Sequence, residues 1–259
     1  MLPWLSDIND NVPKFTEAEY QVEVLETVAV GTSLHSLSAT DPDEGANGRI
    51  RYSLRGGLGR FSIDPVSGVV SVAAALDRET QAEHELLVVA EDQGRPARTA
   101  TATLLVQVSD INDNVPKFTE AEYQVEVLET VAVGTSLHSL SATDPDEGAN
   151  GRVTYSITQQ SPSSENAVFE LDSSSGTLQL VQPLDYSKVE VYRLTVQASD
   201  GGTPSLNESA SVVVKVKDVN NNPPEFSKES YEVSISENLA SGASILTLEV
   251  TDKDEVSYM

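Results

Sequence analysis

The sequence contains no cysteine, and only 16 lysine and arginine residues stand against 41 aspartate and glutamate residues. Without cysteine the chain has neither a disulfide framework nor a thiolate metal site. The formal charge of −25 makes nucleic acid and anionic membrane surfaces poor partners. No apolar run approaches the length of a membrane-spanning helix, and residues 1–5 are too short and lack the basic start of a signal peptide.

The 259 residues suffice for about two domains, and a hydrophobic content of 39% is enough for small cores. If the protein is extracellular, we expect this sequence to be an interior, soluble fragment of a longer, membrane-anchored protein.

An internal repeat dominates the sequence. Residues 6–49 and 109–152 are identical over 44 positions, and 218–226 echoes 110–118. The second halves of the two copies diverge but keep common landmarks, such as Ser67-Gly68 and Ser175-Gly176. The predicted layout is the end of a preceding repeat (1–13), two whole repeats (14–116 and 117–224) and the truncated start of a further repeat (225–259).

Each repeat reads as a series of short strands. Alternation around 20–25 is followed by strand candidates at 34–39, 50–54, 61–63, 69–72, 85–90 and 99–108, with Gly and Pro turns between them. Seven strands in about 100 residues predict an all-β chain of tandem Greek-key β-sandwiches with immunoglobulin-like architecture.

Acidic residues gather at strand ends and in the segment between the repeats. Residues i and i+2 of a strand share a face, so Asp77 and Glu79 can aim at one point, as can Asp144 and Asp146. The 110–114 segment adds four oxygen-bearing side chains in five residues. Like charges about 4 Å apart repel by roughly 4 kcal/mol at an effective dielectric of about 20, so something must compensate this repulsion. An all-oxygen donor set favours Ca²⁺ over zinc, copper, nickel and magnesium.

Together and in this order, these strings resemble the calcium signatures of cadherin extracellular repeats. They are Asp77-Arg-Glu79, Ala90-x-Asp92-x-Gly-x-Pro96, Asp110-x-Asn-Asp-Asn114 and Asp144-x-Asp146. The style is most like the large many-repeat cadherins of the Dachsous, Fat and protocadherin groups. The resemblance covers nearly the whole chain and implies three calcium ions at each junction between repeats.

The resemblance implies ligands at the central junction and at its neighbours. The first ion would take Glu26, Asp77, Glu79 and Asp113, and the second would share Glu26, Glu79 and Asp113 and add Asp110, the Ile111 carbonyl and Asp146. The third would take Asn112, the Asn114 carbonyl, Asp144, Asp146, the Asn150 carbonyl and Asp200. Asn9, Asn11, Asp41, Asp43, Asn47 and Asp92 would form a third-ion site at the front.

The second junction departs from the family pattern. Its candidate ligands are Glu129, Asp185, Asp218, Asn220, Asn222, Asp252 and Asp254. Ser187 and Asn221 stand where the pattern has carboxylates, which predicts that the first two ions bind weakly there.

The function that the resemblance implies is calcium-dependent cell–cell adhesion. Calcium between consecutive repeats would stiffen the extracellular part of a plasma-membrane glycoprotein, whose partner would be another cadherin, homophilic or heterophilic. The alternative is a calcium-stiffened spacer with no adhesive surface of its own.

Other interpretations fit less well. Asp7-x-Asn9-x-Asn11 has the opening spacing of an EF-hand, but Val12 and Ala18 stand where the loop needs Gly and Glu. A glycosidase or glycosyltransferase needs its acids in one cleft, whereas these recur along repeat boundaries, so we expect no enzyme.

Three further features remain outside the acidic motifs. We expect His35, His84 and His138 to be surface or half-buried side chains, and Trp4 to be flanking sequence rather than an adhesive anchor. Asn207-Glu-Ser209 is an N-glycosylation acceptor sequence.

Overall fold

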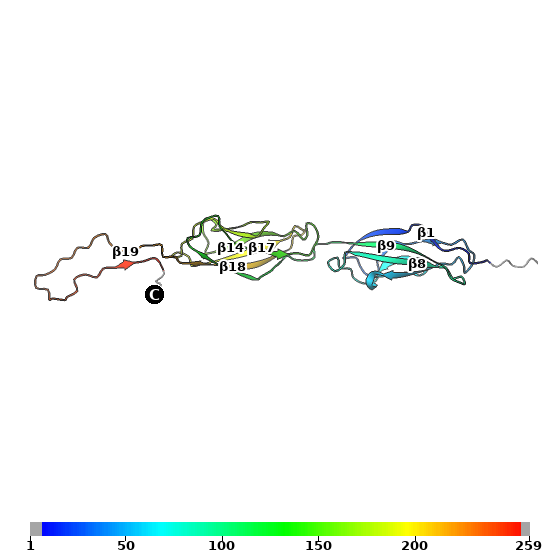
Figure 1. Cartoon of the computed structure of the whole chain (residues 1–259), viewed down its shortest axis with the longest axis horizontal. Helices are drawn as coiled ribbons and strands as arrows, with labels where there is room; N and C mark the ends of the chain where they lie inside the picture. Colours follow the sequence, from blue (N-terminus) through cyan, green and yellow to red (C-terminus); the bar gives the residue numbers. More distant parts are fainter. Residues whose placement is uncertain (1–6, 255–259) are drawn as a thin grey trace, which may run out of the picture. The chain divides into compact units, whose positions relative to one another are not determined.

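The computed structural model describes residues 7–254 and divides into two compact units (Figure 1). Unit 1 contains the residues up to Asp113 together with Pro145–Asn150, and unit 2 contains Asn114–Asp144 and the residues from Gly151. Trp4 lies outside the described residues, so its predicted role is not addressed by the structure.

Unit 1 is a sandwich of two sheets. A four-stranded sheet has the order β2-β9-β8-β5 and a three-stranded sheet has the order β3-β7-β6, while β1 pairs with β4. All neighbours are antiparallel except β2 and β9, which run parallel. The strands are β1 (Lys14–Phe15), β2 (Glu19–Leu25), β3 (Ser33–Ser36), β4 (Ala39–Thr40), β5 (Arg51–Gly56), β6 (Phe61–Ile63), β7 (Val69–Val72), β8 (Glu83–Glu91) and β9 (Thr99–Ser109).

Unit 2 repeats this topology. Its sheets have the orders β11-β18-β17-β14 and β12-β16-β15, with β10 paired to β13 and β11 parallel to β18; β14, β17 and β18 are labelled in Figure 1. The strands are β10 (Lys117–Phe118), β11 (Glu122–Leu128), β12 (Ser136–Ser139), β13 (Ala142–Thr143), β14 (Thr154–Ser161), β15 (Phe169–Leu171), β16 (Thr177–Leu180), β17 (Val191–Ser199) and β18 (Asn207–Lys217).

The core of each unit lies between its two sheets. Alternate residues of β9 point inward, so Leu104 and Val106 are fully buried while the residues between them are partly exposed. In unit 2, Val212 and Val214 on β18 occupy the corresponding places. These alternating apolar faces hold the sandwiches together, since burying a Val or Leu side chain contributes about 1.5–3 kcal/mol.

The structure confirms the predicted all-β fold of tandem sandwiches and corrects one strand. The strand expected at 34–39 is interrupted between β3 and β4, where Leu37 turns fully into the core and its N–H donates to the Gly68 carbonyl at 3.0 Å. A short 3₁₀ turn at Gly57–Gly59 was also not predicted.

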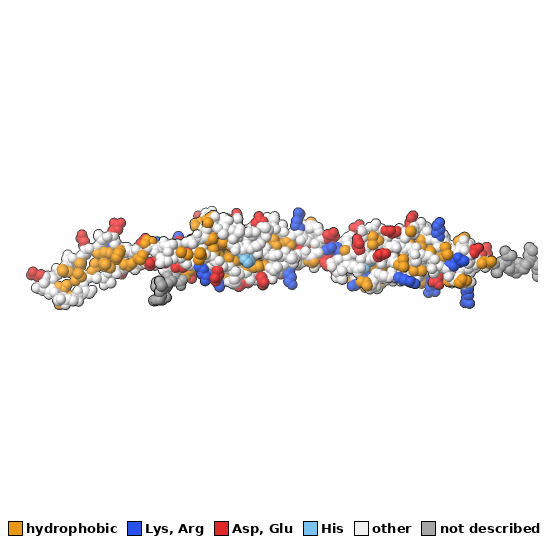
Figure 2. Space-filling model, viewed as in Figure 1, with side chains coloured by type: hydrophobic (Ala, Val, Ile, Leu, Met, Phe, Trp, Pro, Cys, Tyr) orange, Lys and Arg blue, Asp and Glu red, His pale blue; other side chains and the backbone are white. Residues whose placement is uncertain are grey.

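Residues 225–254 form only one strand pair, β19 (Glu225–Phe226) with β20 (Val250–Thr251). Figure 2 shows apolar side chains at the surface of this segment. They include Phe226, Val233, Ile235, Leu239, Ile245, Leu246, Leu248 and Val250, all exposed. Within the described residues no helix is long and apolar enough to cross a membrane.

Candidate metal centre

Glu26 organises the acidic end of unit 1. It follows β2 directly and is only 7% exposed. Its Oε2 accepts the backbone N–H of Arg78 and its Oε1 accepts that of Ile111, both at 3.0 Å. The carboxylate therefore joins the end of β2 to the turn at 77–80 and to the segment after β9.

The turn at 77–80 carries two more carboxylates. Asp77 Oδ1 accepts the Thr80 N–H at 3.1 Å, and Asp77 Oδ2 accepts the Thr80 hydroxyl at 2.6 Å. These two bonds, the hydroxyl first, lower the pKa of Asp77. Asp77 and Glu79 lie in a turn and not in a strand, so the alternation that predicted their convergence is not what brings them together.

Two overlapping carboxylate clusters result. Glu26, Asp77 and Glu79 each place a carboxylate oxygen within 4.8 Å of the others, as do Glu79, Asp113 and Asp146. At this separation and an effective dielectric of about 20, each like-charged pair repels by roughly 3 kcal/mol. Burial, and then the charge of Glu26, raises the pKa of both Glu79 and Asp113. A divalent cation would relieve this repulsion.

Asp110, a predicted ligand of the second ion, is not a member of either cluster. Its Oδ1 accepts Arg78 Nε at 2.7 Å, and its Oδ2 accepts the Glu147 N–H at 3.0 Å and Asn150 Nδ2 at 2.9 Å. Although burial opposes the shift, these hydrogen bonds lower the pKa of Asp110. The Ile111 carbonyl, also a predicted ligand, accepts the Asp113 N–H at 3.0 Å.

The residues predicted for the third ion lie in both compact units, so their assignment stays a prediction. Within unit 2, Asp200 is buried, and its carboxylate accepts the N–H groups of Gly202 at 2.9 Å and Leu206 at 3.0 Å. The remaining members are Asn112, Asn114, Asp144, Asp146 and Asn150.

Most of the predicted front site is tied together within unit 1. Asn9 Nδ2 donates to both carboxylate oxygens of Asp92 at 3.1 Å, and Asn11 N–H donates to Asp43 Oδ2 at 3.1 Å. Asp43 N–H in turn donates to Asp41 Oδ1 at 3.0 Å. Asn47, the remaining member, donates to Asp7 Oδ2 at 3.0 Å.

Two oxygens of the front set suit a hard cation. Asn9 Oδ1 and Asp41 Oδ2 are buried and have no hydrogen-bond partner among the described residues. Buried acceptors without partners carry a desolvation cost that a cation with oxygen ligands would offset. With no sulfur or imidazole in either set, the residues fit calcium.

Unit 2 repeats the arrangement with fewer charges. Glu129 Oε2 accepts the Tyr186 N–H at 2.9 Å, and Glu129, Asp218 and Asp254 form a third carboxylate cluster. Asp185 instead pairs with Lys188 at 2.7 Å, and this pair lowers the pKa of Asp185. Of the other predicted residues, Asn222 N–H donates to Asp254 Oδ2 at 2.8 Å and Asp254 N–H donates to Asp252 Oδ1 at 3.0 Å. The role expected of Asn220 stays a prediction.

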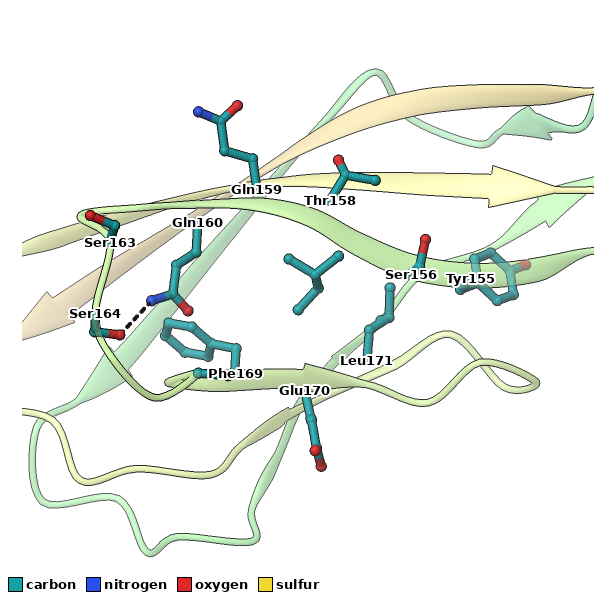
Figure 3. A pocket seen from close by; sticks show the side chains of 12 residues that line it. Tyr155, Ser156, Thr158, Gln159, Gln160, Ser163, Ser164, Phe169, Glu170 and Leu171 are labelled. Carbon is teal, nitrogen blue, oxygen red and sulfur yellow. Dashed lines mark hydrogen bonds between the residues drawn. The ribbon is translucent and has the colours of Figure 1, made fainter.

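A pocket of about 550 Å³ lies elsewhere in unit 2, between β14 and β15 (Figure 3). Gln160 Nε2 donates to Ser164 Oγ at 3.2 Å within it. Its lining includes a single carboxylate, Glu170, whose side chain points away from the cavity in Figure 3. The two facing acids of a glycosidase are therefore not found in this pocket.

The histidines divide into two kinds. His35 and His138 are half-buried, as predicted, but His84 is only 3% exposed and its prediction is wrong. It packs edge-on against Phe61, with ring centroids 5.0 Å apart, because β8 turns this position toward the core. None of the three belongs to a carboxylate cluster.

Comparison with known proteins gives one consistent result. The family model described as "Cadherin domain" matches residues 20–109 and 123–217. Human protocadherin Fat 1 is 43% identical over 96% of this chain, and human protocadherin gamma-A5 is 43% identical over 96%. The chain spans 5% of the first relative and 27% of the second. The solved mouse cadherin-23 EC22-24 superposes with a TM-score of 0.81 at 34% identity, covering 96% of this chain and 80% of that one.

Proposed function

Because this chain belongs to the cadherin family, we propose that it is part of the extracellular region of a plasma-membrane adhesion receptor whose repeats are linked by calcium. Cadherin repeats are structural and adhesive domains rather than enzymes. In this proposal the repeats run over 14–116 and 117–224, and the parent protein meets another cadherin on a facing cell.

The observation that carries the calcium proposal is the pair of clusters that share Glu79. In each cluster three carboxylate oxygens lie within 4.8 Å of one another, and the buried Glu26 of the first cluster already accepts two backbone N–H groups. Such repulsion destabilises the folded state unless another interaction compensates it. Oxygen ligands with flexible geometry are those that calcium takes, six to eight at a time.

Calcium would supply the positive charge that these carboxylates lack. Asp146 reaches the Glu79 cluster from the 145–150 segment, which belongs to the second repeat in sequence. Binding would therefore restrain the start of the second repeat and stiffen the array. Affinities of extracellular calcium modules, about 10⁻⁴–10⁻³ M, would fill the sites outside a cell and leave them empty inside it. We propose in the same way that the residues predicted for the third ion, for the front site and for the carboxylate cluster of unit 2 are calcium ligands.

Equilibrium dialysis with calcium tests this proposal. Wild-type protein should bind several ions per chain at millimolar calcium, and Glu26→Gln should reduce the number bound in unit 1. Glu17→Gln serves as the matched control because Glu17 is exposed and belongs to none of the three clusters. Equal, negligible binding by all three proteins would refute the calcium proposal.

Sedimentation velocity distinguishes adhesion from the spacer role. Self-association that requires calcium supports an adhesive surface on this segment, whereas a monomer at all concentrations supports a calcium-stiffened spacer. The relatives support the adhesion class, and the partner remains part of the proposal.

We also propose that Asn207 carries an N-linked glycan. Asn207 and Ser209 are exposed on one face of β18, while Glu208 points the other way and its Oε2 accepts the Phe118 N–H at 2.8 Å. After secretion from mammalian cells, Asn207→Gln and Ser209→Ala should remove a glycosidase-sensitive mobility shift, and Ser209→Thr should keep it. Equal mobility of all four proteins would refute this assignment.

A further inference from the structure

Arg78 occupies the middle of the acidic end of unit 1, although it is no calcium ligand. Its side chain is 12% exposed. Nε and Nη2 contact Glu79 Oε1 at 3.0 and 2.7 Å, and Nε also contacts Asp110 Oδ1 at 2.7 Å. Nη2 donates to the Pro145 carbonyl at 2.8 Å. One guanidinium thus joins the 77–80 turn, the segment after β9 and the 145–150 loop.

The bond to Asp110 extends this contact deeper into the loop. Asp110 Oδ2 accepts the Glu147 N–H at 3.0 Å and Asn150 Nδ2 at 2.9 Å. The loop is therefore held at Pro145, at Glu147 and at Asn150. Between these points lies Asp146, which is buried and reaches the cluster of Glu79.

We propose that Arg78 is a positioning residue that clasps the 145–150 loop before calcium binds, so that Asp146 is already in place as a ligand. The part of this inference that concerns calcium rests on the proposed function; the clasp itself does not. Arg suits the task because its planar fork holds carboxylates and a carbonyl at once, and charge-assisted hydrogen bonds are stronger than neutral ones. A loop fixed in advance loses less entropy when the ion binds.

The second repeat provides a natural comparison. Tyr186 occupies the place of Arg78, and its N–H makes the same bond to Glu129 that Arg78 makes to Glu26. The backbone is alike, but the guanidinium is missing. Lys188, in the same turn, pairs with Asp185 and is 78% exposed. Unit 2 therefore has the turn without the clasp.

The clasp and simple electrostatics predict opposite changes in calcium affinity when Arg78 is removed. A positive side chain beside a cation site repels the ion, so its removal alone should tighten calcium binding. If Arg78 positions the loop, its removal should weaken binding instead. The direction of the change therefore separates the two accounts.

The experiment measures amide exchange of the whole chain in EDTA and then its calcium midpoint. Arg78→Met should speed exchange in 145–150 by about tenfold without calcium, the scale of a lost charge-assisted hydrogen bond, and should raise the midpoint several-fold. Arg78→Lys should keep part of the exchange protection and part of the calcium affinity, because the positive charge remains while the planar guanidinium is lost. Arg51→Met is the matched control, since Arg51 is exposed on β5.

Three outcomes would overturn the clasp: unchanged exchange of 145–150 in EDTA, faster exchange throughout unit 1 instead of locally, or tighter calcium binding by Arg78→Met. Failure of the proposed function looks different. In that case wild-type protein would not respond to calcium, while exchange of the loop in EDTA would still depend on Arg78.

Discussion

Glu26 accepts the backbone N–H of Arg78 at 3.0 Å across 52 residues of sequence. This bond ties the turn at 77–80 to the end of β2. In that turn Asp77 and Glu79 each place a carboxylate oxygen within 4.8 Å of one of Glu26. These carboxylates are therefore arranged around a buried acceptor and not by the alternation of a strand.

Two identical residues at equivalent positions of the two units should contribute differently to the free energy of unfolding. Val22 and Val125 occupy the same position of the repeated segment, but Val22 is half-buried on β2 and Val125 is 6% exposed on β11. We expect Val125→Ala to destabilise unit 2 by about 2 kcal/mol and Val22→Ala to destabilise unit 1 by about half as much. Urea titration followed by amide exchange in each unit measures both, and equal losses would contradict the difference in packing.

Gly94 should tolerate no side chain. A Cβ there would lie 2.3 Å from Asn9 Nδ2 and 2.9 Å from Asn47 Oδ1, both in the front set. Gly94→Ala should therefore cost about 1–3 kcal/mol and weaken calcium binding at the front.

The control for this substitution is Gly45→Ala. Gly45 has φ +66° and open space around its Cβ position, so its substitution introduces backbone strain without a clash. Calcium binding by Gly94→Ala equal to that of Gly45→Ala, in dialysis, would count against the front site.

His84 should make the stability of unit 1 fall in mild acid. Burial, assisted by the charge of Arg60, lowers the pKa of His84 below its unfolded value of about 6.5. The unfolded chain therefore takes up the proton first. The contribution of neutral His84 is complete above about pH 6.5 and is lost as the pH falls toward the folded pKa, with a slope of up to about 1.4 kcal/mol per pH unit.

Urea titrations between pH 5.5 and 7.5 in excess calcium measure this effect. His84→Gln should flatten the dependence, because the variant has no imidazole to protonate. Parallel curves for variant and wild type would show that His84 does not titrate in this range.

Local patterns predicted the architecture well where one face is buried. The alternation around 20–25 and 99–108 gave β2 and β9 because inward positions of a sandwich are apolar. The break at Leu37 was not predictable, since it depends on a bond to Gly68 in a distant turn. The identical segments also show the limit of local sequence, because Val22 and Val125 have the same neighbours along the chain and yet differ in burial.

The candidate site was predictable as a set of residues but not as a geometry. Family motifs identified the carboxylates, including the three that cluster in unit 2. They did not predict the ion pair between Asp110 and Arg78, because a basic residue between two acidic ones is expected at the surface until its contacts are known. The signal was present in Asp77-Arg78-Glu79, whose central residue differs from Tyr186 in the second repeat.

Thermal melting in EDTA and in millimolar calcium tests the central claim most directly, with Asp113→Ala and the control Asp64→Ala beside wild type. Asp64 caps its own turn through the N–H groups of Val66 and Ser67 and belongs to none of the three carboxylate clusters, so its substitution should leave the calcium response intact. Sites of about 10⁻⁴–10⁻³ M affinity should stabilise the wild-type protein by about 0.4–1.4 kcal/mol each in about 1 mM calcium, a rise of roughly 2–11 °C per site. That rise should be much reduced in Asp113→Ala and retained in Asp64→Ala. The same melting temperature with and without calcium in wild type would contradict the claim that these carboxylates form a calcium site.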